Sequence, residues 1–292
     1  MAAAGHEATT FEQLLTLCCR ESGLSRREAR MLLAVAAGTS QEWLVAHGPD
    51  TAQAAVADRF LALAARRECG EPIAYLTGVR EFYGRPFLVT PAVLIPRPET
   101  ELLVEVALEL LKGAHSPRLL DLGTGSGVLG VTLALERPDA TVLATDASRA
   151  ALQVATANAA TLGSPRIAFC CGDWWQALDQ DVGRFDLIVS NPPYIAADDP
   201  HLSQGDLRFE PSQALVGGPA GDADLRKIIA GAPGRLEDGA WLVVEHGLEQ
   251  GAPCRHLMEE AGFADVLTHR DLEHRERVTV GRALRTPAAS RG

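Results

Sequence analysis

The sequence predicts an α/β protein, in which a small helical domain precedes a mostly parallel sheet with helices on both faces. Two observations support this prediction. Residues 11–70 carry apolar side chains at helical spacing. After residue 98, short apolar runs typical of buried parallel strands alternate with segments of helical pattern. The chain has 292 residues, which is long enough for one large domain or two modest ones.

The first predicted domain is a helical bundle over residues 1–80. Phe11 to Leu17 has the apolar spacing of an amphipathic helix. Ser25 followed by Glu28 is typical of a capping box, in which each side chain bonds the other residue's backbone N–H at the start of a helix. The alanine-rich segment 52–67 predicts a further amphipathic helix.

A β-hairpin that links two domains is predicted over residues 81–97. Strand-forming residues there are interrupted by Gly84, Pro86 and Pro91, as in a turn between short strands. Pro98 then suits the first turn of a helix, and Glu99 favours its positive end. We expect this helix to run to about Leu111.

The second predicted domain covers residues 98–284 and contains seven strands. The candidate strands are 118–122, 141–145, 166–170, 185–190, 240–245, 263–268 and 277–282. Helical segments fill most of the gaps between them, which predicts a mostly parallel sheet covered on both faces. The long polar segment 195–221 is expected to be a lid or substrate loop. Residues 285–292 are expected to be a disordered tail.

Composition narrows the class of protein. The net charge is −11 and the isoelectric point is near 5.2, which argues against a general nucleic-acid binder and predicts no direct nucleic-acid partner. The six cysteines form no C-x-x-C pair, and the histidines show no metal spacing, so we predict reduced thiols in the cytoplasm and no metal site. No run approaches the roughly 18 apolar residues of a membrane helix. We expect a monomer that does not bind membranes.

A glycine-rich turn follows the first strand of the second domain. Gly123, Thr124, Gly125, Ser126 and Gly127 come directly after the apolar run 118–122. Glycines allow a tight turn and let a ligand approach main-chain N–H groups. Asp146, nineteen residues after Gly127, ends the next predicted strand. Its carboxylate can accept hydrogen bonds from both hydroxyls of a ribose there. These residues predict a nucleotide site.

The tetrad Asn191-Pro192-Pro193-Tyr194 follows the buried strand Phe185 to Ser190. Its two prolines end the strand and hold the backbone rigidly. The tetrad offers a side-chain carbonyl, free main-chain carbonyls and an aromatic ring at the carboxyl edge of the sheet, where ligands bind in open α/β folds. Such a site suits a planar amide or amine held by its hydrogens.

Two nucleotides remain in competition at this stage. The spacing Gly125-x-Gly127-x-x-Gly130 formally matches the fingerprint of a dinucleotide dehydrogenase. S-adenosylmethionine is favoured because Asp121, just before the glycines, can meet the positive amino-acid end of that cofactor. The Asn-Pro-Pro-Tyr tetrad, in addition, has no role in hydride transfer.

The segment after the third strand is a candidate adenine site. Asp173 can accept a hydrogen bond from the adenine amino group, and Trp174 can pack on the ring. The alternative is that Trp174 or Trp175 is a core residue.

Taken together, these features resemble the HemK/PrmC family, the N5-glutamine methyltransferases of peptide chain release factors. The resemblance is carried by six stretches that span most of the chain: Glu71 to Gly78, Pro91 to Glu101, Asp121 to Gly127, Ser190 to Ile195, Leu207 to Pro211, and Glu245 to Gly247. The Ile-Pro-Arg-Pro-Glu-Thr-Glu stretch is far more specific than the glycine turn, which related methyltransferases share.

The resemblance implies a class I S-adenosylmethionine-dependent methyltransferase fold, Rossmann-like and seven-stranded, after a small N-terminal helical domain that binds the substrate protein. It implies that Gly123 to Gly127, Asp146, Trp174 and Asn191 bind S-adenosylmethionine. It further implies that Asn191 to Tyr194 hold a glutamine in the Gly-Gly-Gln loop of a class I release factor, whose methylation aids translation termination.

The expected chemistry follows from the weak nucleophilicity of an amide nitrogen. The Asn191 side-chain oxygen and the Pro192 main-chain carbonyl can each accept one amide hydrogen, which favours a pyramidal nitrogen. Tyr194 can stack on the planar amide. Glu210 is a weaker candidate for shaping the substrate pocket, and His246 is expected to be structural.

Two other functions remain open from the residues alone. The Asn-Pro-Pro-Tyr tetrad also occurs in adenine-N6 DNA methyltransferases, whose target amine is chemically similar and must be flipped out of the helix. A nucleotide-binding scaffold without catalysis is the other alternative, and the intact tetrad disfavours it.

Overall fold

The computed structural model describes residues 9–164 and 166–284, and it divides into two compact units, Met1–Val79 and Arg80–Gly292. The two units meet between Val79 and Arg80, next to the end of the helical domain that the sequence predicts at residue 80. The predicted disordered tail, 285–292, lies outside the described residues.

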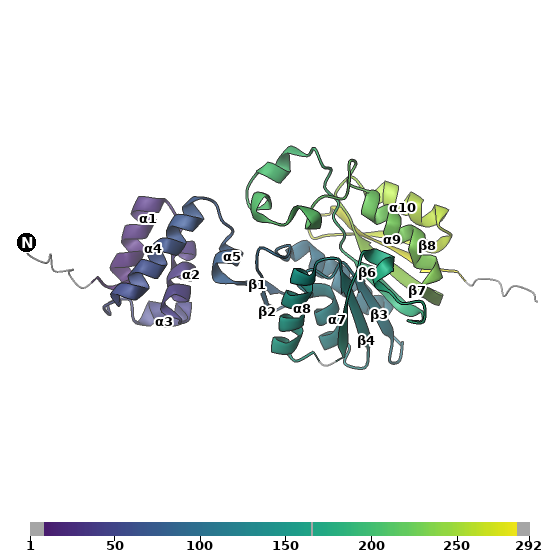
Figure 1. Ribbon diagram of the computed structural model, residues 1–292, viewed down its shortest axis with the longest axis horizontal. Coiled ribbons are helices and arrows are strands. Elements are labelled where there is room, and N and C mark those ends of the chain that lie inside the picture. Colours follow the sequence, from purple (N-terminus) through teal and green to yellow (C-terminus); the bar gives the residue numbers. More distant parts are fainter. Residues whose placement is uncertain (1–8, 165, 285–292) are drawn as a thin grey trace, which may run out of the picture. The chain divides into compact units, whose positions relative to one another are not determined.

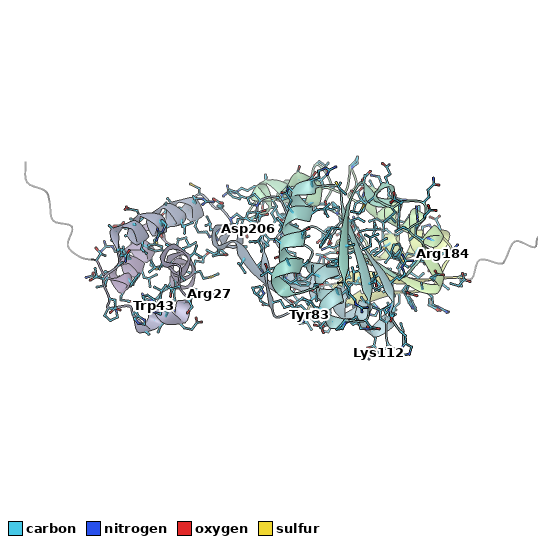
Figure 2. The ribbon with its side chains drawn as sticks, turned by 60° about the horizontal axis from the view of Figure 1, so that its bottom comes forward. Arg27, Trp43, Tyr83, Lys112, Arg184 and Asp206 are labelled. Carbon is cyan, nitrogen blue, oxygen red and sulfur yellow. The ribbon has the colours of Figure 1, made fainter. Side chains whose placement is uncertain are left out.

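The first unit is a helical bundle, as the sequence predicts. Its helices are α1 (Phe11–Ser22), α2 (Arg26–Ala37), α3 (Gln41–Ala46), α4 (Ala54–Glu68) and α5 (Ile73–Thr77). The predicted capping box is present at Ser25, and Thr10 forms a second one at the start of α1. Leu32, Leu33 and Phe60 are fully buried at the centre of the bundle. Trp43 on α3 is exposed (Figure 2). Its ring stacks on that of His47, with ring centroids 4.0 Å apart.

A short hairpin opens the second unit. Its strands are β1 (Val79–Phe82) and β2 (Arg85–Leu88), which form a separate two-stranded sheet. Phe82 and Phe87 are buried in the core of the second unit, with their rings 6.0 Å apart in an edge-to-face arrangement. The predicted hairpin therefore packs as part of this unit.

All seven predicted strands are present in the main sheet. They are β3 (Arg118–Leu122), β4 (Thr141–Asp146), β5 (Ile167–Cys171), β6 (Phe185–Ser190), β7 (Leu236–Glu245), β8 (Phe263–Arg270) and β9 (Glu276–Ala283). The order across the sheet is β5-β4-β3-β6-β7-β9-β8, and β9 runs antiparallel to both of its neighbours. The chain moves outward from β3 in one direction and then returns to β6 on its other side. This reversal leaves a crevice at the carboxyl ends of β3 and β6, where ligands bind in open α/β sheets.

Helices cover both faces of the sheet (Figure 1). One face packs against α6 (Glu101–Leu110), α7 (Val128–Glu136) and α8 (Arg149–Leu162), and the other against α9 (Ala223–Gly231) and α10 (Gly251–Glu260). Neighbouring residues on a strand alternate between the two cores, as Leu119 and Leu120 do on β3. The remaining regular pieces are single turns: η1 (Pro98–Thr100), η2 (Trp174–Ala177), η3 (Pro200–Ser203), η4 (Leu207–Phe209), η5 (Ser212–Ala214) and η6 (Ala232–Gly234).

Candidate active site

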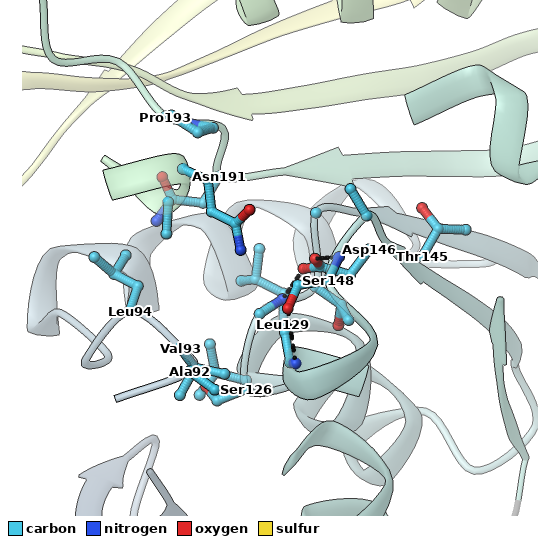
Figure 3. Close-up of a pocket in the computed structure, with 18 of the residues that line it drawn as sticks. Ala92, Val93, Leu94, Ser126, Leu129, Thr145, Asp146, Ser148, Asn191 and Pro193 are labelled. Carbon is cyan, nitrogen blue, oxygen red and sulfur yellow. Dashed lines mark hydrogen bonds between the residues drawn. The ribbon is translucent and has the colours of Figure 1, made fainter. Parts of the chain in front are cut away.

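Two adjoining cavities open at the carboxyl ends of β3, β4 and β6. The larger is lined by the glycine turn, the end of β4, the segment after β5 and the start of the tetrad. The smaller is lined by the whole tetrad and by residues 207, 214 and 215 of the long loop. Asn191, Pro193 and Arg97 line both cavities. Figure 3 shows the side chains of Asn191, which follows β6, and Asp146, which ends β4, at the larger cavity.

The glycine turn is anchored to the neighbouring strand. The backbone N–H groups of Gly123 and Thr124 both donate to the carbonyl of Thr145, at 2.9 and 2.8 Å. Gly125 lines the larger cavity and has a φ of +55°. No atom lies within 4 Å of the place where its Cβ would stand. A side chain at Gly125 would therefore occupy the space that a ligand needs.

Asp146 lies at the end of β4, where the sequence predicts it. Its Oδ2 accepts a hydrogen bond from the Gly125 N–H at 2.9 Å, and its Oδ1 accepts one from the Ser148 N–H at 2.8 Å. Burial raises the pKa of this carboxyl group, while the two backbone donors act to lower it. Each oxygen retains a further lone pair. The carboxylate is thus held rigidly at the cavity wall with acceptor capacity to spare.

Asp121, the candidate for the positive amino-acid end of S-adenosylmethionine, lies behind the glycine turn. It is fully buried and does not line either cavity. Its Oδ2 accepts hydrogen bonds from the Thr124 hydroxyl at 2.6 Å and from the Gly130 N–H at 2.9 Å. Burial raises the pKa of Asp121 to about 6. The strand-end position places the carboxyl group where it supports the glycine turn through Thr124 and Gly130.

Asp173 and Trp174 both line the larger cavity. A Cβ on Gly123 would lie only 3.1 Å from the Trp174 ring, so this ring packs directly over the glycine. The Trp174 indole N–H donates to Oδ1 of Asp224 at 3.1 Å. The backbone of Trp174 has a φ of +43°, in the left-handed region. Trp175 instead donates to the Lys227 carbonyl at 2.8 Å and lines neither cavity. The two adjacent tryptophans therefore have different surroundings.

The tetrad lies at the junction of the two cavities. The side-chain nitrogen of Asn191 donates to the Thr100 hydroxyl at 3.2 Å, so its side-chain oxygen stays available to a ligand. Pro192 is buried. The Tyr194 hydroxyl donates to Glu245 at 3.5 Å, and burial raises the pKa of Tyr194.

The long loop 195–221 packs against the tetrad. Ile195 and Val216 form a parallel bridge, in which the Ile195 N–H donates to the Leu215 carbonyl at 2.9 Å. The predicted loop is present, and it contains the three 3-10 turns η3, η4 and η5. Glu210, the weaker candidate for the pocket, is buried and forms an ion pair with Arg97 at 2.6 Å. Burial raises the pKa of Glu210, which Arg97 acts to lower.

Comparison with known proteins identifies the family. Residues 13–78 match the PrmC N-terminal domain model, and residues 99–206 match the methyltransferase small domain model. A release factor glutamine methyltransferase from Bordetella pertussis is 53% identical, covering 89% of this chain and 96% of that protein. One from Escherichia coli K12 is 46% identical, covering 88% of this chain and 92% of that protein. The chain belongs to the family of release factor glutamine methyltransferases.

The fold agrees with this family. A solved 16S rRNA N2 G1207 methyltransferase of T. thermophilus matches 70% of this chain and 49% of its own, with 22% identity and a TM-score of 0.52. Family membership excludes the dinucleotide dehydrogenase that the glycine spacing left open, and the sheet is that of a class I methyltransferase.

Several residues that form the site were not predicted from the sequence. Thr100 and Arg97 lie in the specific stretch before α6, so the resemblance marked their segment without giving their contacts. Gln250 donates to the carbonyls of Tyr194 at 3.3 Å and Gly221 at 3.0 Å. Asp224, the partner of Trp174, gave no signal in the sequence.

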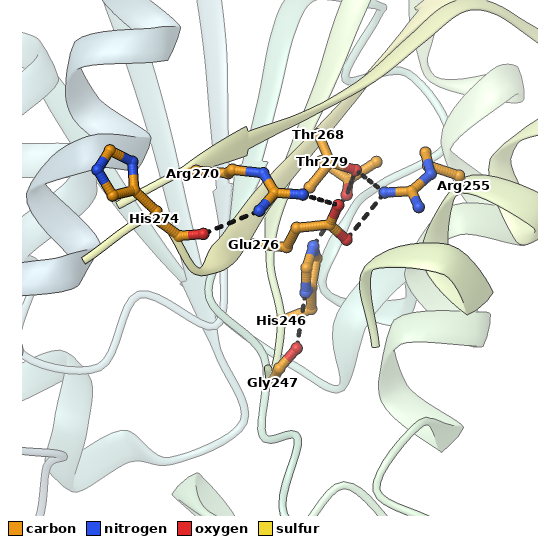
Figure 4. A network of polar contacts seen from close by, with 8 residues as sticks. All are labelled: His246, Gly247, Arg255, Thr268, Arg270, His274, Glu276 and Thr279. Carbon is orange, nitrogen blue, oxygen red and sulfur yellow. Dashed lines mark hydrogen bonds and ion pairs between the residues drawn. The ribbon is translucent and has the colours of Figure 1, made fainter. Parts of the chain in front are cut away.

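His246, which directly follows β7, belongs to a polar network with side chains of α10, β8 and β9, as Figure 4 shows. Its Nε2 lies 2.9 Å from the Thr279 hydroxyl and its Nδ1 lies 2.9 Å from the Gly247 carbonyl. Burial lowers its pKa. These contacts agree with the structural role expected for His246.

In residues 9–164 and 166–284, no group of three His, Cys, Asp or Glu side chains is arranged to hold a metal. Within the same residues, no helix is long and apolar enough to cross a membrane.

Proposed function

We propose that this protein transfers a methyl group from S-adenosylmethionine to the side-chain amide nitrogen (N5) of the glutamine in the Gly-Gly-Gln motif of class I peptide release factors. The observation that carries this proposal is the position of Asn191, at the junction of two cavities, with its side-chain nitrogen bound to Thr100 and its oxygen free. The names of its close relatives support the same substrate. Such methylation would aid translation termination.

The larger cavity fits S-adenosylmethionine, which supplies an electrophilic methyl group when bound. The turn from Gly123 to Gly127 leaves open space at Gly125, as the close approach of a ligand requires. Asp146 has spare lone pairs for two ribose hydroxyls. Trp174 offers a ring face and Asp173 an acceptor in the same cavity, which suits an adenine.

The smaller cavity suits the planar amide of a glutamine. The Asn191 side-chain oxygen and the Pro192 carbonyl would each accept one amide hydrogen. Among the described residues, no hydrogen bond ends on the Pro192 carbonyl, and Pro192 lines this cavity. Two fixed acceptors stabilise the positive charge that develops on the nitrogen. Positioning of two reactants contributes about 7–11 kcal/mol in good cases, so a strong general base is not needed.

The substrate of this site would be a protein loop. In a Gly-Gly-Gln loop the flanking glycines let the glutamine enter a deep pocket. We assign a second face of the release factor to the helical domain, which matches the PrmC N-terminal domain model. We propose that the enzyme acts as a monomer in the cytoplasm, without direct contact to nucleic acid or membranes.

The decisive test is mass spectrometry of a purified class I release factor after incubation with this protein and S-adenosylmethionine. We expect one added methyl group on the glutamine of Gly-Gly-Gln. Asn191→Ala should abolish transfer while S-adenosylmethionine binding persists. Undiminished transfer by that variant would reject the role of Asn191. No added methyl, with the cofactor shown to bind, would reject the substrate and make adenine-N6 methylation of labelled DNA the next test.

A further inference from the structure

Gln250 contacts the tetrad from outside both cavities. It is half-buried at the start of α10, where its backbone N–H donates to the Gly247 carbonyl at 3.0 Å. Its backbone carbonyl accepts from the N–H of Cys254, a fully buried core residue, at 2.8 Å. The backbone of Gln250 is therefore fixed by the turn 247–250 on one side and by the first turn of α10 on the other. Its side chain extends from a rigid support.

The side-chain amide of Gln250 bonds three backbone groups from three segments of the chain. Its Oε1 accepts from the Gly247 N–H at 2.9 Å. Its Nε2 donates to the carbonyls of Tyr194, at 3.3 Å, and of Gly221, at 3.0 Å. A backbone N–H can only donate and a carbonyl can only accept, so these partners fix which end of the amide faces which group. Gln250 therefore joins the end of the tetrad to the end of the loop 195–221.

The Tyr194 carbonyl belongs to a peptide group that is held at both ends. The N–H of the same group, on Ile195, donates to the Leu215 carbonyl at 2.9 Å. Among the described residues, Gln250 is the only hydrogen-bond donor to the Tyr194 carbonyl. A peptide group is planar, so bonds at both its N–H and its C=O prevent the whole plane from rotating. The direction in which the chain leaves the tetrad is thereby fixed.

Gly221 packs against the same carbonyl. A Cβ on Gly221 would lie 2.5 Å from the Tyr194 carbonyl oxygen, so the end of the long loop touches the tetrad directly. Gly221 is buried, and within the described chain Gln250 is the only hydrogen-bond donor to its carbonyl too. A buried carbonyl without a donor is unfavourable. The two hydrogens of one NH₂ group supply the donors that both carbonyls need.

We propose that Gln250 is a positioning residue, whose side-chain amide fixes the Tyr194 carbonyl against the end of the long loop and so holds the tetrad in its working geometry. This inference rests on the proposed transfer to a glutamine amide, in which Asn191 and Pro192 accept the two amide hydrogens together. Gln250 lines neither cavity, so it acts through the tetrad. A misplacement of about 1 Å can lower a reaction rate about a hundredfold.

Two variants of Gln250 separate this role from a local one in the turn 247–250. Gln250→Glu keeps the shape and the acceptor for the Gly247 N–H, but a carboxylate cannot donate to the two carbonyls. Gln250→Met loses all three bonds at nearly the same length and adds no charge. We expect both variants to lower the turnover number of release factor methylation about tenfold to hundredfold. KM should change less, because the lining of both cavities is kept.

The cofactor site provides an independent readout. The dissociation constant for S-adenosylmethionine, measured by calorimetry, should change less than about threefold in both variants. Gln153→Glu is the matched control, at an exposed position of α8 outside both cavities. It makes the same chemical change as Gln250→Glu and should keep the wild-type turnover.

The outcomes separate the two proposals. Wild-type turnover in Gln250→Glu would overturn the inference, because the bond to Gly247 would then be sufficient. Wild-type turnover in Gln250→Met would also overturn it and would assign any loss in Gln250→Glu to the added charge. If Gln250→Met does not fold, Gln250→Glu and Gln153→Glu decide alone. Absence of transfer by the wild-type protein, with cofactor bound, would remove the proposed function and with it this inference.

Discussion

Arg97 donates from one guanidinium nitrogen to both carboxylate oxygens of Glu210, at 2.7 and 2.6 Å. The Glu210 side chain is fully buried and that of Arg97 is 28% exposed. The pair joins the segment before α6 to the long loop, although 113 residues separate the two partners. It therefore closes the long loop against the segment before α6, whose Arg97 lines the smaller cavity.

Glu210→Gln should loosen this closure. The substitution leaves the Arg97 charge without its carboxylate, and we expect the free energy of unfolding to fall by about 1–3 kcal/mol in urea denaturation. KM for the release factor should rise, because the loop forms part of its cavity. Arg282→Gln breaks an exposed pair with Asp265 and is the control, with an expected change below about 1 kcal/mol. Equal stability of the two variants would contradict the role of the pair.

Gly217→Ala should displace the tetrad. A Cβ there would lie 2.3 Å from the Pro193 carbonyl oxygen and 2.6 Å from that of Gly221, so backbone must shift. We expect a loss of stability of about 1–3 kcal/mol, as for overpacking, together with a fall in turnover. Gly234→Ala is the matched control, since no atom lies within 4 Å of its added Cβ. Wild-type turnover in Gly217→Ala would show that the tetrad tolerates this movement.

Asp146→Asn should weaken the binding of S-adenosylmethionine. The amide offers one acceptor oxygen where the carboxylate offers two, and it disturbs the bond to the Gly125 N–H. We expect the dissociation constant, measured by calorimetry, to rise about tenfold to hundredfold. Asp58→Asn, on the exposed face of α4, controls for the loss of a charge. Equal affinity in the two variants would remove the proposed ribose contact.

Trp174 should report cofactor binding by its fluorescence. Its ring lines the larger cavity, whereas the adjacent Trp175 lines neither cavity. A ligand that stacks on the indole changes its environment, so we expect the emission to change on titration with S-adenosylmethionine. The change should be lost in Trp174→Phe and kept in Trp175→Phe. A signal that survives in Trp174→Phe would place the adenine elsewhere.

The strands and the tetrad were predictable because they are encoded locally. Buried parallel strands such as β6 are unbroken apolar runs in the sequence. All seven predicted strands are present, although β7 begins at Leu236 and the prediction began at residue 240. Asp146 and Asn191 were found because they follow such runs, and the ends of parallel strands share one edge of the sheet.

The polar contacts that hold the site were not predictable in this way. Thr100 and Asn191 are 91 residues apart, and only the folded topology brings them together. Asp121 shows the same limit. Its place at a strand end was predictable, but its hydrogen bonds under the turn, from Thr124 and Gly130, were not. A pattern gives the position of a residue along a strand more reliably than the direction of its side chain.

The pH dependence of stability should carry the signature of Glu245. Burial raises the pKa of Glu245 from 4.5 to about 7, and the charge of Glu99 acts in the same direction. Hydrogen bonding by Thr100 and Tyr194 and the charge of Arg277 act to lower this pKa. The folded state therefore holds this proton to higher pH than the unfolded state. The stability that protonation contributes is fully present below about pH 4.5 and is lost as the pH rises through about 7.

Urea denaturation of the wild type and Glu245→Gln between about pH 5 and 8 measures this contribution. A glutamine does not titrate, so the variant should lose less stability than the wild type as the pH rises. Asp121, whose pKa is raised to about 6, also contributes to the pH dependence of stability, and it does so in both proteins. Glu237→Gln, at an exposed position of β7, should follow the wild type. Parallel curves for the wild type and Glu245→Gln would mean that the carboxyl group is ionised throughout, and its burial would then be balanced by Thr100, Tyr194 and Arg277.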